Sequence, residues 1–332
     1  MDKLIIFTDF ATLLVPTLLT EATLQATCNR NDLEVSGVCI RNFQKYHYLL
    51  LRHARTVMKN KIKRFFDYSQ NQRSNTPLPS DIERLARRYR FKIILPPDQN
   101  INNRKFIKQL KTKLKPTIAL SYYCFQKFSP DLLKIFDYSA NYHNGLLPGY
   151  RGVKATCWSL YQGDSETGVT FHRMNEKFDE GNILLRGAVP VGPGSSVTDL
   201  EYEKALKAVN DIPRLIEILI NREPGQAQVN ESNYFSEKDF QNIKRIDDPS
   251  KHSSFELMRR LRAFGSLIIN IGGKWYDVTK LAKKPAPPKN QGELYFQTRD
   301  GVIMQPSRFC YVPFPMYQVL NWIRCTLARL SV

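Results

Sequence analysis

The stretch that decides both fold and chemistry reads Asn141-Tyr142-His143-Asn144-Gly145-Leu146-Leu147-Pro148-Gly149-Tyr150-Arg151-Gly152. Asn141 and His143 stand two residues apart, so an extended segment would carry both side chains on one side. A second stretch reads Gly168-Val169-Thr170-Phe171-His172-Arg173-Met174 and continues with Phe178-Asp179-Glu180-Gly181-Asn182-Ile183. Asn141, His143 and Asp179 together can polarise a carbonyl, move a proton and hold an imidazole in one orientation.

These stretches resemble the formyltransferase family that uses 10-formyltetrahydrofolate, which includes methionyl-tRNA formyltransferase, glycinamide ribonucleotide transformylase and the sugar N-formyltransferases. The family pattern is Asn-x-His-x-Ser-Leu-Leu-Pro-x-x-Arg-Gly, then Gly-Val-Thr, then an Asp-x-Gly turn. The match runs over residues 141–183, and Gly145 stands where the family often has Ser. The resemblance implies a formyltransferase, a one-carbon transferase that uses 10-formyltetrahydrofolate as co-substrate.

Formyl transfer to an amine passes through a tetrahedral oxyanion, and each of the three residues suits one part of that step. Asn141 can donate an amide N–H to the oxyanion, and His143 can donate a proton or a hydrogen bond to the same centre. Asp179 can accept a hydrogen bond from the imidazole. The resemblance assigns these same roles, and neither the chemistry nor the pattern requires a metal. Taken singly, Asn141 could instead cap a strand and Asp179 could be a turn residue. His172, with apolar neighbours, is predicted to be structural.

The folate pocket is placed by the resemblance alone. In the family, the segment after the strand at 117–121 lines the folate with backbone groups, and here that segment carries Gln126, Lys127 and Phe128. The family's opposite wall ends in the catalytic Asp. It corresponds to residues 175–179, and its predicted contacts are Asn175, Phe178 and Asp179. The loop after the catalytic strand adds Leu147 and Pro148 to the predicted cofactor-binding residues.

Apolar patterning predicts strands at 4–8, 33–40, 91–95 and 117–121, with helices at 13–26, 79–90 and 102–114 between them. This alternation indicates an α/β fold with a doubly wound, mostly parallel, Rossmann-like sheet. A long helix over 196–221 then ends near a Pro-Gly pair. We therefore expect a catalytic domain over 1–225 and a small β-rich C-terminal domain over 226–332. The latter has strands at 266–271, 274–278, 292–297 and 301–304 and a hairpin turn at Gly272-Gly273.

The net charge of +18 is concentrated in one part of the chain. Residues 41–73 hold nine basic side chains against one acid, and residues 74–115 hold eleven against three. An insertion at about 42–76 interrupts the strand–helix alternation, and its apolar spacing predicts a basic amphipathic helix. The segment 41–115 is therefore expected to meet an anionic partner, which could be RNA, the phosphates of a nucleotide sugar or a membrane surface.

Other features set the class of protein. No apolar run reaches the length of a transmembrane segment, and the first residues do not resemble a signal peptide, so a cytoplasmic location is expected. The six cysteines form no CxxC pair and have no metal-ligand spacing. Cys28, Cys39, Cys124 and Cys157 stand among apolar residues and are interpreted as reduced core residues.

The acceptor amine is the main open choice. An amino sugar on a nucleotide carrier is favoured, and methionyl-tRNA is the alternative. The basic charge and the β-rich C-terminal domain favour tRNA. Against it, Thr8-Asp9-Phe10 stands where tRNA enzymes usually have Gly-Thr-Pro, and residues 153–156 lack their usual Ala-Ala-Pro. Two further hypotheses are a non-catalytic folate- or RNA-binding protein on the same scaffold and a hydrolase that releases formate.

Overall fold

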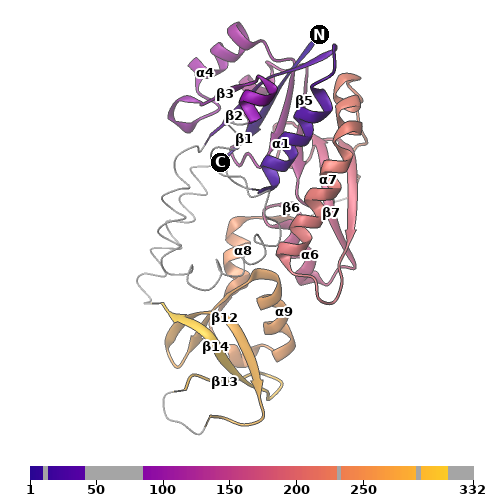
Figure 1. The fold of residues 1–332 in the computed structure, drawn as a ribbon. Helices are drawn as coiled ribbons and strands as arrows, with labels where there is room; N and C mark the ends of the chain where they lie inside the picture. Colours follow the sequence, from indigo (N-terminus) through magenta and orange to yellow (C-terminus); the bar gives the residue numbers. More distant parts are fainter. Residues whose placement is uncertain (10–13, 42–84, 230–232, 289–292, 313–332) are drawn as a thin grey trace. The chain divides into compact units, whose positions relative to one another are not determined.

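The computed structural model describes residues 1–9, 14–41, 85–229, 233–288 and 293–312, and these fall into two compact units (Figure 1). The first unit comprises Met1–His143, Val169–Gly187 and Lys204–Val229, and the second comprises Asn144–Gly168, Ala188–Glu203 and Asn230–Val332. The predicted basic insertion at 42–76 lies outside the described residues. The predicted domain division at residue 225 stays a prediction.

The large sheet has seven strands among the described residues. Their spatial order is β3 (Lys92–Ile94), β2 (Leu33–Ile40), β1 (Asp2–Thr8), β4 (Ile118–Tyr122), β5 (Tyr138–His143), β7 (Glu166–Arg173) and β8 (Ile183–Pro190). The first five pair in parallel, and β7 pairs with β5 in the antiparallel sense. The predicted mostly parallel, doubly wound sheet is therefore confirmed.

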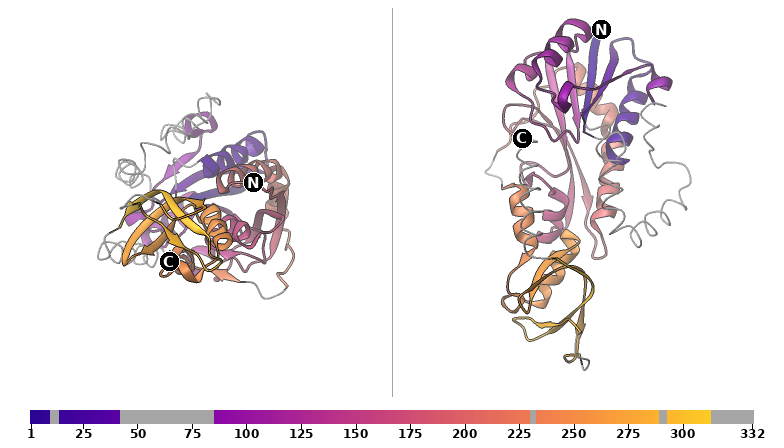
Figure 2. Two further views of the ribbon diagram at one scale, coloured as in Figure 1. Left: turned by 90° about the horizontal axis from the view of Figure 1, so that it is seen from below. Right: turned by 90° about the vertical axis from the view of Figure 1, so that its left-hand side faces the viewer.

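Alternating side chains of the strands bury both faces of this sheet. Leu4 and Ile6 of β1 pack in one core with α1 (Leu14–Thr27) and the part of α7 (Val197–Ile220) from residue 208 on. Ile5 and Phe7 pack in the other core with α4 (Arg104–Gln109) and α5 (Pro130–Leu133). Helices thus cover the sheet on both sides, as Figure 2 shows. Such a sheet leaves the carboxyl ends of its parallel strands as the place where ligands bind.

Local sequence signals explain where several elements begin and end. Asn103 caps α4, because its side chain accepts hydrogen bonds from the backbone N–H groups of Lys105 and Phe106. The helix predicted over 102–114 continues as the π-helical turn η2 (Leu110–Leu114). The short turn η1 (Pro97–Gln99) precedes it. The helix predicted over 79–90 lies partly outside the described residues. The long helix predicted over 196–221 is α7, with Pro213 inside it.

The second unit contains a separate five-stranded sheet. Its order is β10 (Arg245–Ile246), β11 (Leu267–Ile271), β12 (Lys274–Lys284), β14 (Ile303–Tyr311) and β13 (Phe296–Gln297). Gly272 and Gly273 take positive φ angles of 59° and 78° between β11 and β12, so the predicted hairpin turn is confirmed. The unit also holds β6 (Arg151–Gly152), α6 (Ala155–Gln162), β9 (Tyr234–Phe235), α8 (Glu237–Lys244), η3 (Pro249–Lys251) and α9 (Ser254–Phe264).

Two general predictions can be checked in the described ranges. No helix there combines the length and the apolar character that crossing a bilayer requires. The interpretation of Cys28 as a core residue is wrong, because it is exposed at the end of α1, whereas Cys39 and Cys157 are buried.

Candidate active site

The antiparallel pairing of β5 and β7 brings the polar residues of both signature stretches together. In this register Asn141 lies opposite His172, and His143 lies opposite Thr170. The amide nitrogen Nδ2 of Asn141 is 3.1 Å from Nε2 of His172. Asn141 and His143 share one side of β5, as their spacing in an extended strand requires.

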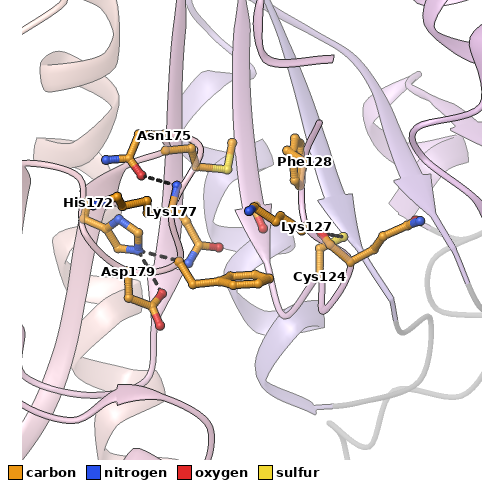
Figure 3. Close-up of a pocket in the computed structure, with 12 residues that line it drawn as sticks. Cys124, Lys127, Phe128, His172, Asn175, Lys177 and Asp179 are labelled. Carbon is orange, nitrogen blue, oxygen red and sulfur yellow. Dashed lines mark hydrogen bonds and ion pairs between the residues drawn. The ribbon is translucent and has the colours of Figure 1, made fainter. Parts of the chain in front are cut away.

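Asp179 completes the cluster from the loop that follows β7. Its Oδ1 is 3.5 Å from Nδ1 of His143 and 3.4 Å from Nε2 of His172. All three side chains are buried in the first unit. Figure 3 shows His172 directed at Asp179. One carboxylate therefore faces two imidazoles, and the predicted trio of Asn141, His143 and Asp179 meets at one place.

His172, which the sequence predicts to be structural, lies next to two of the predicted catalytic residues, Asn141 and Asp179. Its Nδ1 is 2.8 Å from the backbone carbonyl oxygen of Arg173, which can only accept, so Nδ1 carries a hydrogen. In the neutral ring, Nε2 then accepts a hydrogen bond from the Asn141 amide. In the protonated ring, Nε2–H instead faces the carboxylate of Asp179. His172 thus orients two of the three predicted catalytic side chains, a role visible only once the strand register is known.

The charge state of Asp179 follows from these neighbours. Burial by itself would raise the pKa of this carboxyl. The charge of His143 and the hydrogen bonds from His143 and His172 outweigh burial, and they hold the pKa of Asp179 well below its usual value. Asp179 is therefore ionised at neutral pH, as a group that orients and stabilises an imidazolium must be.

The backbone around Asp179 is shaped by a close approach. Asp179 itself takes a positive φ of 56°. A Cβ at Gly181 would lie 1.9 Å from the carbonyl oxygen of Arg173, so only glycine lets the turn pack on β7. Gln228 donates from Nε2 to the carbonyl oxygens of Asp179 and Gly181, each at 2.8 Å. No sequence signal pointed to Gln228, because it is far along the chain and belongs to no motif.

A pocket of about 420 Å³, its open mouth included, lies beside this cluster in the first unit. Six of the predicted cofactor-binding residues line it, and so do two of the catalytic ones. The lining comprises Ser121, Cys124, Gln126, Lys127, Phe128, Asn141, His172, Met174, Asn175, Lys177, Phe178 and Asp179 (Figure 3). Leu147 and Pro148 belong to the second unit and are not part of this lining.

Side-chain contacts hold the walls of the pocket in place and link them. The Gln126 side chain accepts from the backbone N–H of Ile101 and donates to Asn100, so it holds the wall in place. The ammonium nitrogen of Lys127 lies 5.8 Å from the centre of the Phe178 ring, which links one wall to the other. Phe128 and Phe178 give the lining its apolar part, and Asn141, His172 and Asp179 give it a polar part. In the described residues, no group of three His, Cys, Asp or Glu side chains could hold a metal ion.

On this doubly wound α/β fold, an amide, two imidazoles and a carboxylate come together beside a pocket. Such groups can stabilise an oxyanion and move a proton. Residues 74–216 match the family model described as formyl transferase.

Similar proteins are found both by sequence and by structure. GDP-perosamine N-formyltransferase of Brucella melitensis is 34% identical over 148 residues, which cover 43% of this chain and 56% of that protein. The chain therefore matches little more than half the length of this curated relative. Among solved structures, a sugar N-formyltransferase from Shewanella sp. superposes with a TM-score of 0.58 at 16% identity, covering 95% of this chain and 97% of that one. An N-formyltransferase from Helicobacter canadensis, in complex with folinic acid and dTDP-3-aminofucose, gives 0.55 at 17%, covering 92% and 99%. The last two similarities establish the fold.

Proposed function

We propose that the protein is an N-formyltransferase that moves the formyl group of 10-formyltetrahydrofolate to the amine of an amino sugar on a nucleotide carrier. The observation that carries the proposal is the cluster of Asn141, His143, His172 and Asp179 at the polar end of a pocket. The relatives favour this acceptor, since one is named for GDP-perosamine and another was solved with folinic acid and an aminofucose nucleotide.

The geometry suits each step of the transfer. The acceptor amine attacks the formyl carbon, a C–N bond forms, and the carbonyl oxygen becomes an oxyanion. Asn141 has two amide N–H groups; one is directed at His172, which fixes the amide plane and leaves the other for the oxyanion. The amine gives a proton to His143, and His143 passes it to the departing folate nitrogen as the old C–N bond breaks. Asp179 stabilises the charged imidazole while it exists.

The pocket would hold the folate. Its lining includes Phe128 from one wall and Phe178 from the opposite wall. A pterin ring can stack between such walls while its polar edge binds backbone groups. Leu147 and Pro148 belong to the second unit and do not line this pocket, and we keep them as proposed folate contacts.

The test combines binding with turnover. Folinic acid (5-formyltetrahydrofolate) should bind the purified protein in titration calorimetry without added metal. Formyl transfer should then be detected with GDP- or dTDP-linked amino sugars. An Asn141→Ala/His143→Ala double variant should keep folinic acid binding and lose transfer. Failure of the wild-type protein to bind folinic acid at millimolar concentration would overturn the proposal.

The alternative acceptor, methionyl-tRNA, is favoured by one observation. Six basic side chains of residues 104–115 are exposed along α4 and η2, and no acidic residue stands among them; they are Arg104, Lys105, Lys108, Lys111, Lys113 and Lys115. We propose that the basic segment 41–115 contacts an anionic partner. A nucleotide sugar offers only its two phosphates, whereas a tRNA offers many, so the two acceptors differ in salt dependence.

This difference can be measured directly. Replacing Lys105, Lys108 and Lys111 by Gln should leave the salt dependence of the acceptor KM shallow if the acceptor is a nucleotide sugar. With tRNA, the wild-type slope should be steep and should fall by about one unit per lost phosphate contact. The same change at Lys280, Lys283 and Lys284, exposed on β12, is the matched control. If the acceptor KM depends steeply on salt, and replacing Lys105, Lys108 and Lys111 makes that dependence shallower, the acceptor is tRNA and not a nucleotide sugar.

A further inference from the structure

Asp9 is a buried carboxylate that the catalytic scheme does not use. It directly follows β1, and only 1% of its surface is exposed. Arg41, which directly follows β2, donates from Nε to Oδ1 at 2.7 Å and from Nη2 to Oδ2 at 2.5 Å. This two-point pairing offsets the cost of burying the carboxylate, because both of its oxygens receive charged donors.

Asp9 also forms hydrogen bonds with the backbone just after the end of β4. The backbone N–H of Phe125 donates to Oδ2 of Asp9 at 3.0 Å. The backbone N–H of Asp9 donates to the carbonyl oxygen of Tyr123 at 3.3 Å. Tyr123 takes a positive φ of 56°, an uncommon conformation for a residue with a side chain. Asp9 therefore contacts the backbone on both sides of Cys124, at the base of the pocket wall.

The far side of that wall is held by a second set of contacts. Asn102 donates from Nδ2 to the carbonyl oxygen of Lys127 and accepts from the backbone N–H of Ser129, both at 2.8 Å. Gln126 is fixed by Ile101 and Asn100, as described above. Residues 124–129 are thus held by hydrogen bonds at both ends of the segment. Asp9, paired with Arg41, makes the contacts at the end nearest the sheet.

We propose that Asp9, paired with Arg41, is a positioning residue for folate binding: it sets the backbone of residues 124–128, on which the pterin would lie. This inference rests on the proposed function. A carboxylate is needed because it accepts three N–H donors at once, two from Arg41 and one from Phe125. An asparagine at this position has a single acceptor oxygen and must give up part of this set.

The test is Asp9→Asn. The dissociation constant of folinic acid in calorimetry, and the KM for the folate co-substrate, should both rise by roughly tenfold or more, the size expected for losing a hydrogen bond to a charged group. The turnover number at saturating folate and the KM for the acceptor should stay near the wild-type values. Hydrogen exchange at the Phe125 amide should accelerate, since its acceptor is weakened. If Asp9→Asn folds poorly, adding Arg41→Gln removes the stranded cation and permits the same measurements.

Asp2→Asn is the matched control. Arg222 forks onto Asp2 at 2.8 and 2.6 Å, so this variant breaks the same kind of pair at the opposite end of the same strand, β1. It should lose stability without weakening folinic acid binding. Unchanged folinic acid affinity in folded Asp9→Asn, or an equal loss in Asp2→Asn, would overturn the inference. Wild-type protein that binds no folinic acid would instead overturn the proposed function.

Discussion

Asp179 and Asp9 are two buried carboxylates of the same unit with different partners. Asp179 faces two imidazoles at 3.5 and 3.4 Å, whereas Asp9 is held by one guanidinium at 2.7 and 2.5 Å. An imidazole can gain and lose a proton near neutral pH, but a guanidinium stays protonated. The environment of Asp179 therefore permits proton transfer, and that of Asp9 permits only positioning.

The contact lengths point the same way. The Asp9 pair is short and two-pronged, which fixes both groups and leaves little freedom for either. The contacts of Asp179 are longer than ideal hydrogen bonds, as catalytic contacts often are before the substrate binds. A reacting imidazole needs this freedom, because its partner changes during the reaction. The comparison predicts that the two carboxylates affect different kinetic constants.

Asp179→Asn should have the largest effect on turnover. An amide cannot stabilise the imidazolium of His143, so the turnover number should fall by about 10²- to 10⁴-fold, the usual contribution of a general acid–base group. Because Asp179 also lines the pocket, folinic acid affinity in calorimetry should fall as well, but by far less than turnover. Asp9→Asn should show the opposite pattern, with the folate constants altered and turnover retained. If the two variants lose turnover equally, the contrast between the carboxylates is wrong.

Gly181→Ala should come next, because it moves Asp179 without altering its charge. The new Cβ would lie 1.9 Å from the Arg173 carbonyl oxygen, so the turn must shift away from β7. Misplacement by about 1 Å can cost on the order of 100-fold in rate. Turnover and melting temperature should both fall.

The control for this prediction is Gly194→Ala, where an added Cβ meets nothing within 4 Å. It should behave like the wild-type protein in both measurements. Wild-type turnover in Gly181→Ala would show that the position of Asp179 is not critical.

His172→Gln should have a smaller effect that is visible as a pH shift. The hydrogen bond from His172 helps to lower the pKa of Asp179, so losing it should raise that pKa. Since Asp179 must be ionised, the acid limb of the turnover profile should move to higher pH. Turnover at neutral pH should fall by roughly tenfold, because the Asn141 amide loses the hydrogen bond to His172 that orients it.

The matched control is His252→Gln, which breaks a histidine–carboxylate pair with Glu256 at 3.1 Å in the second unit. Its acid limb should coincide with that of the wild-type protein. An unmoved acid limb in His172→Gln would return His172 to the purely structural role that the sequence favoured.

Much of this arrangement could be predicted because it is local in the sequence. Asn141 and His143 share one strand, and their spacing alone places them on one side. Four of the seven described strands of the large sheet, β1, β2, β3 and β4, are apolar enough to be recognised one by one. The Asp-x-Gly turn is likewise a short-range signal, and the close approach of Gly181 to β7 supplies its physical reason.

What the sequence did not reveal depends on pairing between distant segments. His172 meets Asn141 only because β7 runs antiparallel to β5, whereas a doubly wound pattern predicts parallel neighbours. Asp9 and Arg41 are 32 residues apart and meet because β1 and β2 end side by side. Gln228 reaches Asp179 from 49 residues away. No periodicity encodes such contacts.

Asp2→Asn should have the smallest effect and completes the comparison. The hydrogen bond from Arg222 is the main reason that the pKa of Asp2 lies below its usual value. The folded-state pKa is thus lower than the unfolded one, which is about 3.9. The pair therefore stabilises the fold fully above the unfolded pKa, and this stabilisation disappears as the pH falls through the folded pKa.

Denaturant unfolding of both proteins across this range checks the sign. The wild-type protein should be more stable than Asp2→Asn at neutral pH, and the two should converge in acid. Turnover and folinic acid affinity should not differ, because Asp2 begins β1 at the end away from Asp9. An equal stability gap at every pH would show that Asp2 acts through packing rather than charge. A loss of folate affinity would show that breaking any ion pair on β1 disturbs the pocket, and Asp9 would then have no special position.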